Sequence, residues 1–260
     1  MSVNQTRFMS TTIKQFNRYE LKYLVTVAQK QQISTALTDS MHADRHGDSG
    51  EGYLITSLYY DSSNYKSYWD KIEGHRFRRK LRIRVYGENS VTENSPAFIE
   101  IKQRINKTLQ KRRLIMPYQA AETLCSQGLV TTEIKADDQP LVDEIQYLTN
   151  TLQLLPTCVV AYQRLAFAGT EYDPGLRITF DMHLKARVQD LSLRSLGHTA
   201  NRYFAPPQWV VMEVKVNDRV PYWVTQLLGK HGCVLRRVGK YCTALEEAKI
   251  PLYQQRINEK

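Results

Sequence analysis

Short segments in which charged and apolar residues alternate are the feature of this sequence that most constrains its fold. In the segment Leu81-Arg82-Ile83-Arg84-Val85, two arginines alternate with three aliphatic residues. Because side chains at positions i and i+2 lie on the same face of a β-strand, this segment predicts a strand with one apolar face and one charged face. The same alternation occurs in Arg18–Tyr23, Phe98–Lys102, Lys111–Arg113, Leu176–Asp181 and Val210–Lys215.

The alternating segments belong to a predicted set of about eight strands with helices between them. Such a set favours an α+β fold built on a barrel or a sandwich. No linker or break in composition divides the sequence, so we expect a single domain over residues 1–260. The expected strands are Arg18–Val25, Leu54–Tyr60, Arg79–Tyr86, Ala97–Arg104, Thr108–Met116, Cys158–Phe167, Leu176–Met182 and Trp209–Val216.

Capping residues, prolines and glycines place the helices. Thr26 can cap a helix that runs to Met41, and Gln29 has the spacing that completes a capping box. A polar segment, His42–Gly52, follows as an expected loop. The other expected helices are Pro117 to Gly128, Pro140 to about Leu154, Pro221 to Gly229 or Gly232, and Tyr241 to about Lys249.

The charge balance indicates a polyanionic partner. The sequence has 36 Lys and Arg against 26 Asp and Glu, a net charge of +10, which suits nucleic acid, an anionic membrane or a phosphate-rich small molecule. No run approaches about 18 apolar residues, so we expect no transmembrane helix. The polar segment Met1–Gln15 does not resemble a secretory signal, and the four scattered cysteines indicate reduced thiols. We therefore expect a cytoplasmic protein.

The charged strand faces have two interpretations. Faces of this kind commonly point into solvent in antiparallel sheets. However, a Glu-x-Lys pair occurs three times, at Glu20/Lys22, Glu100/Lys102 and Glu213/Lys215. If the strands close into a barrel, these residues line its interior, where an excess of cations is costly without a bound anion. Such an interior suits a polyphosphate together with Mg²⁺ or Mn²⁺ held by carboxylates.

Several of these segments together resemble a known family. The sequence is similar to the VTC domain, the catalytic polyphosphate polymerase domain of the vacuolar transporter chaperone complex, within the CYTH-like triphosphate tunnel metalloenzymes. The similarity extends over residues of about 16–247. It is carried by Arg18–Tyr23, Leu58–Asp61, Arg82–Gly87, Phe98–Lys102, Tyr162–Phe167, Arg177–Asp181, Val211–Lys215 and Gly239–Tyr241.

The resemblance implies a closed antiparallel β-barrel of about eight strands that forms a tunnel with flanking helices. It implies transfer of the terminal phosphate of ATP to a growing inorganic polyphosphate chain, with Mn²⁺ or Mg²⁺. The metal ligand would be Glu213, with Glu100 as a second candidate, while Asp181 could bind metal or orient an arginine. The implied catalytic residues are Lys22, Arg82, Arg84, Lys102, Arg164, Arg177, Lys215 and Lys240, and the implied substrate-binding residues are Lys71, Lys111 and Arg113.

Two of the substrate-binding assignments are open at this stage. The run Lys111-Arg112-Arg113 allows two registers, and relatives have arginine where this sequence has Lys71. Two other functions also remain open. A hydrolase of the same fold would use water in place of the phosphate acceptor, and a non-catalytic module would bind polyanions or RNA. The basic run Arg76–Lys80 could contact RNA, although a solvated face or a rim that steers anions is our preferred interpretation.

Overall fold

One antiparallel sheet contains all ten strands of the described part of the protein. The computed structural model describes residues 19–44, 52–87, 90–106, 108–194, 201–217 and 219–249. The main path of the sheet is β1-β10-β8-β7-β3-β4-β5-β6, with β2 beside β7 and β9 beside β8. The strands are β1 (Tyr19–Thr26), β2 (Met41–Ala43), β3 (Tyr53–Asp61), β4 (Phe77–Tyr86), β5 (Pro96–Ile105), β6 (Thr108–Pro117), β7 (Leu155–Gly169), β8 (Arg177–Arg187), β9 (Arg202–Tyr203) and β10 (Trp209–Val216).

The eight expected strands are confirmed, apart from their exact ends. Arg18, the expected first residue of the N-terminal strand, lies outside the described residues. The short strands β2 and β9 were not expected, and β2 includes His42 from the expected loop.

The expected helices are also found, with one addition. Thr26 forms the predicted capping box, because the Gln29 amide donates to Thr26 Oγ1 over 3.1 Å and the Thr26 amide donates to Gln29 Oε1 over 2.8 Å. That helix ends at Leu37 and not at Met41, because Met41 begins β2. The addition is α2. The helices are α1 (Val27–Leu37), α2 (Lys66–Ile72), α3 (Tyr118–Gln127), α4 (Gln139–Leu152), α5 (Tyr222–Lys230) and α6 (Lys240–Glu247).

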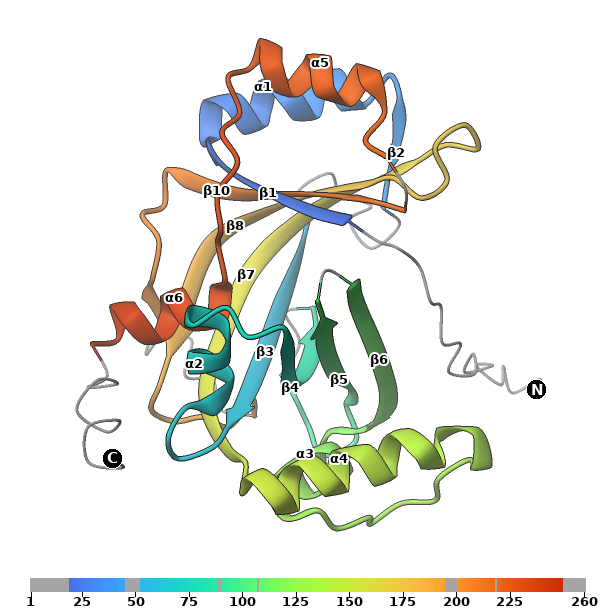
Figure 1. The fold of residues 1–260 in the computed structure, drawn as a ribbon, viewed down its shortest axis with the longest axis vertical. Helices are drawn as coiled ribbons and strands as arrows, with labels where there is room; N and C mark the ends of the chain where they lie inside the picture. The colour runs from blue at the N-terminus through green and yellow to red at the C-terminus, as the bar shows by residue number, and fades with distance from the viewer. Residues whose placement is uncertain are drawn as a thin grey trace.

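The expected closed barrel is not confirmed. Backbone hydrogen bonds join the strands in an open path, and no pairing connects its end strands β1 and β6 within the described residues. The sheet nevertheless curls, so that β1 and β10 lie across from β5 and β6 (Figure 1). A side-chain ion pair spans this opening, with Lys102 Nζ on β5 lying 3.0 Å from Glu20 Oε2 on β1. Because two side chains span this opening, β1 and β5 lie farther apart than the ~4.8 Å that separates hydrogen-bonded strands.

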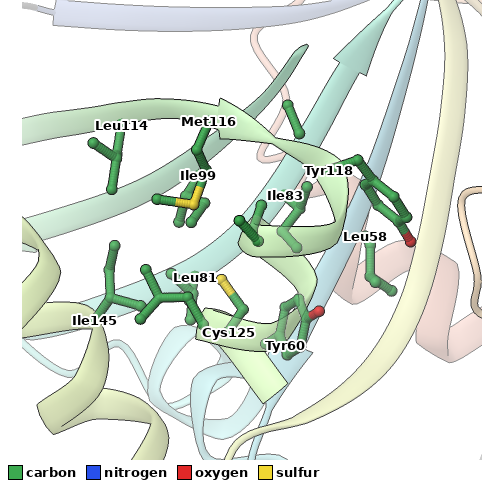
Figure 2. Close-up of a cluster of buried hydrophobic side chains, with 14 of the residues drawn as sticks. Leu58, Tyr60, Leu81, Ile83, Ile99, Leu114, Met116, Tyr118, Cys125 and Ile145 are labelled. Atoms are coloured by element: carbon green, nitrogen blue, oxygen red, sulfur yellow. The ribbon is translucent and has the colours of Figure 1, made fainter. Parts of the chain in front are cut away.

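Helix pairs cover the outer face of the curled sheet. The α3–α4 pair packs on the apolar faces of β4, β5 and β6, where Ile83, Ile99 and Ile145 are almost completely buried (Figure 2). At the other end, α1 and α5 pack against β1, β10 and β8 through a cluster that includes Ile33, Phe180 and Val224. Since the outer face supplies these two apolar clusters, the alternating charged residues are left on the inner face.

Candidate functional site

The strand register brings the charged positions onto one face of the sheet. Arg82 on β4 lies opposite Glu100 on β5, which lies opposite Arg113 on β6. On the other side of the opening, Lys22 on β1 lies opposite Glu213 on β10. Directly opposite residues in antiparallel strands share a face. The inner face therefore carries two charged clusters, each built around a buried carboxylate.

The first cluster, which we call the Glu100 cluster, surrounds a carboxylate that is 1% exposed. Arg82 contacts Glu100 Oε2 through Nη2 at 2.6 Å, and Arg84 Nη1 lies 3.8 Å from the same oxygen. Lys111 Nζ lies 2.5 Å from Oε1, and Arg113 Nε donates to Oε1 over 2.8 Å. Lys111 and Arg113 both point inward, which resolves the register left open by the sequence. Four cations thus surround one carboxylate.

The second cluster, the Glu213 cluster, contains two buried carboxylates. Glu213 Oε1 lies 3.1 Å from Lys22 and 2.9 Å from Lys240, and Oε2 lies 2.7 Å from Lys215. Arg164 donates to both carboxylate oxygens of Asp181, through Nε over 2.6 Å and through Nη2 over 2.7 Å. Lys240 also contacts Asp181, at 2.5 Å. Of the two roles considered for Asp181, orientation of an arginine is the one this geometry displays.

Glu20 links the two clusters. It accepts from Lys102 over 3.0 Å and lies 3.1 Å from Lys22. The link spans the opening of the sheet, so cations from both edges lie along a common surface. Cationic side chains outnumber carboxylates on this surface, and that excess favours a polyanionic ligand.

Two further implied residues lie outside both clusters and outside the Lys102–Glu20 link. Arg177 on β8 contacts Asp44 at 2.5 Å and donates to the Tyr53 hydroxyl over 3.4 Å. The end of the Lys71 side chain on α2 lies against Gly239, since a Cβ atom on that glycine would be 3.1 Å from Lys71 Cε. Gly239 precedes Lys240, so Lys71 is next to the Glu213 cluster without an ion pair to it among the described residues.

Tyrosines on the inner face hold the arginines in place. Arg82 Nη1 donates to the Tyr59 hydroxyl over 2.8 Å, and Arg84 Nη2 donates to the Tyr162 hydroxyl over 3.1 Å. A guanidinium that is fixed by neutral and anionic acceptors loses little further freedom when it binds phosphate. These tyrosines therefore pre-organise the two arginines.

Sequence reasoning did not assign Tyr59 or Tyr162 to the site. It placed Glu20 on the expected interior through the Glu-x-Lys pair with Lys22, but it gave Glu20 no role. For the tyrosines no signal was available, because their hydroxyls meet the arginines only through the pairing of β3, β4 and β7.

The charges set the pKa values of the central groups. Burial alone would raise the pKa of Glu213, but Lys215, Lys22 and Lys240 outweigh burial and hold that pKa well below its usual value. Burial likewise fails to raise the pKa of Glu100, because Arg82, Arg84 and the other nearby cations hold it well below the usual range. Both carboxylates are therefore ionised at neutral pH.

Lys215 behaves differently from the carboxylates. Burial lowers the pKa of Lys215 to about 8, although Glu213 acts in the opposite direction. A bound polyanion favours the ammonium form, so binding near pH 8 takes up a proton. We expect the affinity for inorganic triphosphate to fall by up to about tenfold per pH unit above pH 8.

Calorimetry between pH 7 and pH 9 in two buffers of different ionisation enthalpy measures this uptake. The ionisation of triphosphate itself is common to every variant, so the control is Lys215→Arg, whose guanidinium keeps its charge. The variant should show less proton uptake and a flatter pH profile. Identical profiles for the two proteins would contradict the assignment of Lys215.

The donor set bears on whether a divalent metal fits the site. No group of three or more His, Cys, Asp or Glu residues that could hold a metal occurs among the described residues. Mg²⁺ is usually bound by one or two carboxylates together with substrate phosphates, and it needs no cage made only of protein. Glu213 supplies hard oxygen ligands of this kind. Glu100 supplies the same kind of ligand. Each of the two carboxylates already contacts four cations, so the ion pairs do not distinguish them as metal ligands.

Comparison with protein families identifies the chain. The family model of the VTC domain matches residues 17–249. The chain belongs to the VTC domain family. The resemblance drawn from the sequence motifs is therefore confirmed. No match was found among curated protein sequences.

Solved structures of three other proteins are similar to this VTC domain. A protein from Hippeastrum, described as a candidate adenylyl cyclase with a dominant triphosphatase activity, is 16% identical with a TM-score of 0.51, over 90% of this chain and 97% of that one. A candidate adenylate cyclase from Bacillus halodurans is 12% identical with a TM-score of 0.48, over 89% and 96% of the two chains. One from Vibrio parahaemolyticus is 12% identical with a TM-score of 0.44, over 89% and 98%. At 16% identity, the Hippeastrum protein supports the fold alone.

Within the described residues of this VTC domain, the helices are too short or too polar to cross a membrane.

Proposed function

We propose that this VTC domain is a metal-dependent polyphosphate polymerase that transfers the terminal phosphate of ATP to a growing inorganic polyphosphate chain. The observation that supports this proposal is the excess of cations on one curled, partly enclosed face. The Glu100 cluster and the Glu213 cluster lie on either side of the Lys102–Glu20 ion pair. An elongated polyanion that contacts both clusters would compensate the excess charge, which a single phosphate could not do.

The chemistry requires alignment and charge neutralisation more than a covalent step. The acceptor is a phosphate oxygen that is already ionised at neutral pH, so no general base is needed. Arg82 and Arg84 offer forked donors to the non-bridging oxygens of the transferred group. Lys215 and Lys240 act as compact charges that stabilise the charge developing in the transition state. The remaining implied cations, Lys22, Lys102, Lys111, Arg113 and Arg164, bind flanking phosphates, while Arg177 and Lys71 lie at the margins of the site.

The metal would be held by Glu213 together with phosphate oxygens of the substrate. When bound, Mn²⁺ or Mg²⁺ neutralises charge on the transferring phosphate and its neighbours. To hold the ion, Glu213 would give up one of its contacts with an ammonium group. Of the three lysines that contact Glu213, only Lys215 has a lowered pKa, whereas the pKa values of Lys22 and Lys240 are raised. The contact between Lys215 and Glu213 is therefore the one most easily given up.

A triphosphatase is the second candidate function, and a specific observation favours it. The Hippeastrum protein that shares this fold is described as having a dominant triphosphatase activity. In that reaction, water replaces the phosphate acceptor, and the same cations would hold the triphosphate.

Incubation of the purified 260-residue protein with ATP and Mn²⁺, followed by resolution of the products on a gel, separates these functions. We expect polyphosphate that grows with time, together with ADP. Release of inorganic phosphate without polymer would replace the polymerase by the triphosphatase. If neither product forms and RNA binds tightly in a salt-sensitive manner, the protein is a non-catalytic binding module.

Cysteine chemistry supports a cytoplasmic location, which we include in the proposal. All four cysteines are free, and Cys125, Cys158 and Cys242 are buried. Free thiols are typical of a reducing compartment. Fractionation of cells that express the tagged protein tests this location.

A further inference from the structure

The motif Leu58-Tyr59-Tyr60-Asp61 includes a buried carboxylate that the proposed chemistry does not use. Asp61 is the last residue of β3 and is 0% exposed. Its Oδ2 accepts a hydrogen bond from the Tyr241 hydroxyl over 2.6 Å. It also accepts from the backbone amides of Ser62, Ser67 and Tyr68, at 2.9, 2.8 and 3.1 Å. No cation forms an ion pair with Asp61 in the described part of the protein, so its partners are neutral donors.

These bonds join three elements at the end of the inner face. The amides of Ser67 and Tyr68 belong to the first turn of α2, whose own N-cap residue, Tyr65, provides no side-chain cap. Asp61 therefore satisfies two of the amide donors that this helix start leaves open. Tyr241 lies in the first turn of α6, directly after Lys240. Asp61 thus fixes the start of α6 against the start of α2 and the end of β3.

Both charged clusters are connected to this junction. Lys240 is the first residue of α6 and contacts Glu213 and Asp181. The Tyr241 ring stacks on the Tyr59 ring with centroids 5.1 Å apart, and the Tyr59 hydroxyl accepts from Arg82. A displacement of Tyr241 would therefore move Lys240 through the backbone and Arg82 through the stacked ring.

We propose that Asp61 is a positioning residue that, through the Tyr241 hydroxyl, holds Lys240 and Arg82 in the relative placement that triphosphate binding requires. This inference rests on the proposed function only in that both use the same phosphate-binding face. Asp61 itself contacts no substrate in this arrangement, because its two oxygens are enclosed by Tyr241 and by the amides of Ser62, Ser67 and Tyr68.

The variant Tyr241→Phe tests the proposal. It retains the ring that stacks on Tyr59 and removes the hydrogen bond to Asp61. Tyr118→Phe is the matched control, since Tyr118 is equally buried and its hydroxyl donates to Glu122 over 2.8 Å on the outer side of the sheet. The probe is inorganic triphosphate without metal, measured by calorimetry at low ionic strength, and this measurement needs no turnover.

We expect Tyr241→Phe to weaken triphosphate binding about tenfold, and Tyr118→Phe to change it less than about twofold. The loss should shrink in the background of Lys240→Ala or of Arg82→Ala, because a positioning residue acts through the groups it places. A purely structural role would give the same loss in all three backgrounds, or equal losses for both phenylalanine variants, and either result overturns the proposal.

Failure of the proposed function gives a different result. If the wild-type protein makes no polymer but Tyr241→Phe still weakens triphosphate binding in the coupled manner, the positioning role stands and the polymerase does not. Unchanged triphosphate affinity in Tyr241→Phe, with polymer formed normally, removes the positioning role alone. Absence of triphosphate binding to the wild-type protein contradicts both.

Discussion

Replacement of Arg82 by alanine is expected to reduce ATP turnover by about a hundredfold or more while the protein remains folded. Arg82 is held by Glu100 and by the Tyr59 hydroxyl, so its guanidinium is oriented before the substrate binds. Loss of one pre-organised donor to a developing anion commonly costs about 10²–10³ in rate. Glu100 keeps Arg84, Lys111 and Arg113 as partners in the variant. Its charge therefore remains compensated, and the fold should persist.

Product formation from ATP and Mn²⁺ measures the effect, and circular dichroism checks the fold. Arg112→Ala is the matched control. Arg112 lies between Lys111 and Arg113 but pairs with Glu144 on α4, on the outer face. We expect Arg112→Ala to turn over ATP at the wild-type rate when the assay temperature is well below the melting point of the variant. Normal turnover by a folded Arg82→Ala protein would remove Arg82 from the site.

The second large effect is expected from Glu213→Gln. The change removes a negative charge from among Lys22, Lys215 and Lys240 but retains the shape of the side chain. Metal-stimulated turnover should fall about a hundredfold, because the carboxylate that would hold the ion is lost. Affinity for triphosphate without metal should instead rise, since one repulsive charge has been removed.

This opposite movement of turnover and affinity separates a metal ligand from a residue that only supports the fold. The ligand-free variant should also melt at a lower temperature, because Lys22, Lys215 and Lys240 lose a shared counterion, and triphosphate should restore much of the loss. Glu144→Gln on the outer face is the control and should leave activation by Mn²⁺ unchanged. Retention of full Mn²⁺ activation by Glu213→Gln would exclude it as the metal ligand.

The inner face could be predicted from sequence because a strand has a period of two residues. Once Leu81, Ile83 and Val85 are assigned to the apolar core, Arg82 and Arg84 have to share the other face. The same reasoning placed Glu100 beside Lys102 and Glu213 beside Lys215 along single strands. Which strands are neighbours was not predicted, since alternation alone says nothing about sheet order.

Three features could not be derived in this way. Closure of the sheet depends on twist accumulated over many strands, which no local pattern encodes. The helix α2 has a first turn that is held by Asp61 and an N-cap residue, Tyr65, in a left-handed conformation with φ of 56°. The serine that contacts this helix start, Ser62, lies four residues before Lys66 and not at the N-cap position, so it gave no capping signal. Arg177 was grouped with the other cations, but its partner Asp44 follows β2, a strand that was not predicted.

The ion pair between Lys102 and Glu20 has a consequence for how the two edges of the sheet respond to their surroundings. Backbone hydrogen bonds between strands depend little on salt concentration. In contrast, an ion pair whose lysine side chain is 40% exposed is screened by dissolved salt. The spacing between β1 and β5 is therefore adjustable by ionic conditions and by any multivalent guest that competes for Lys102.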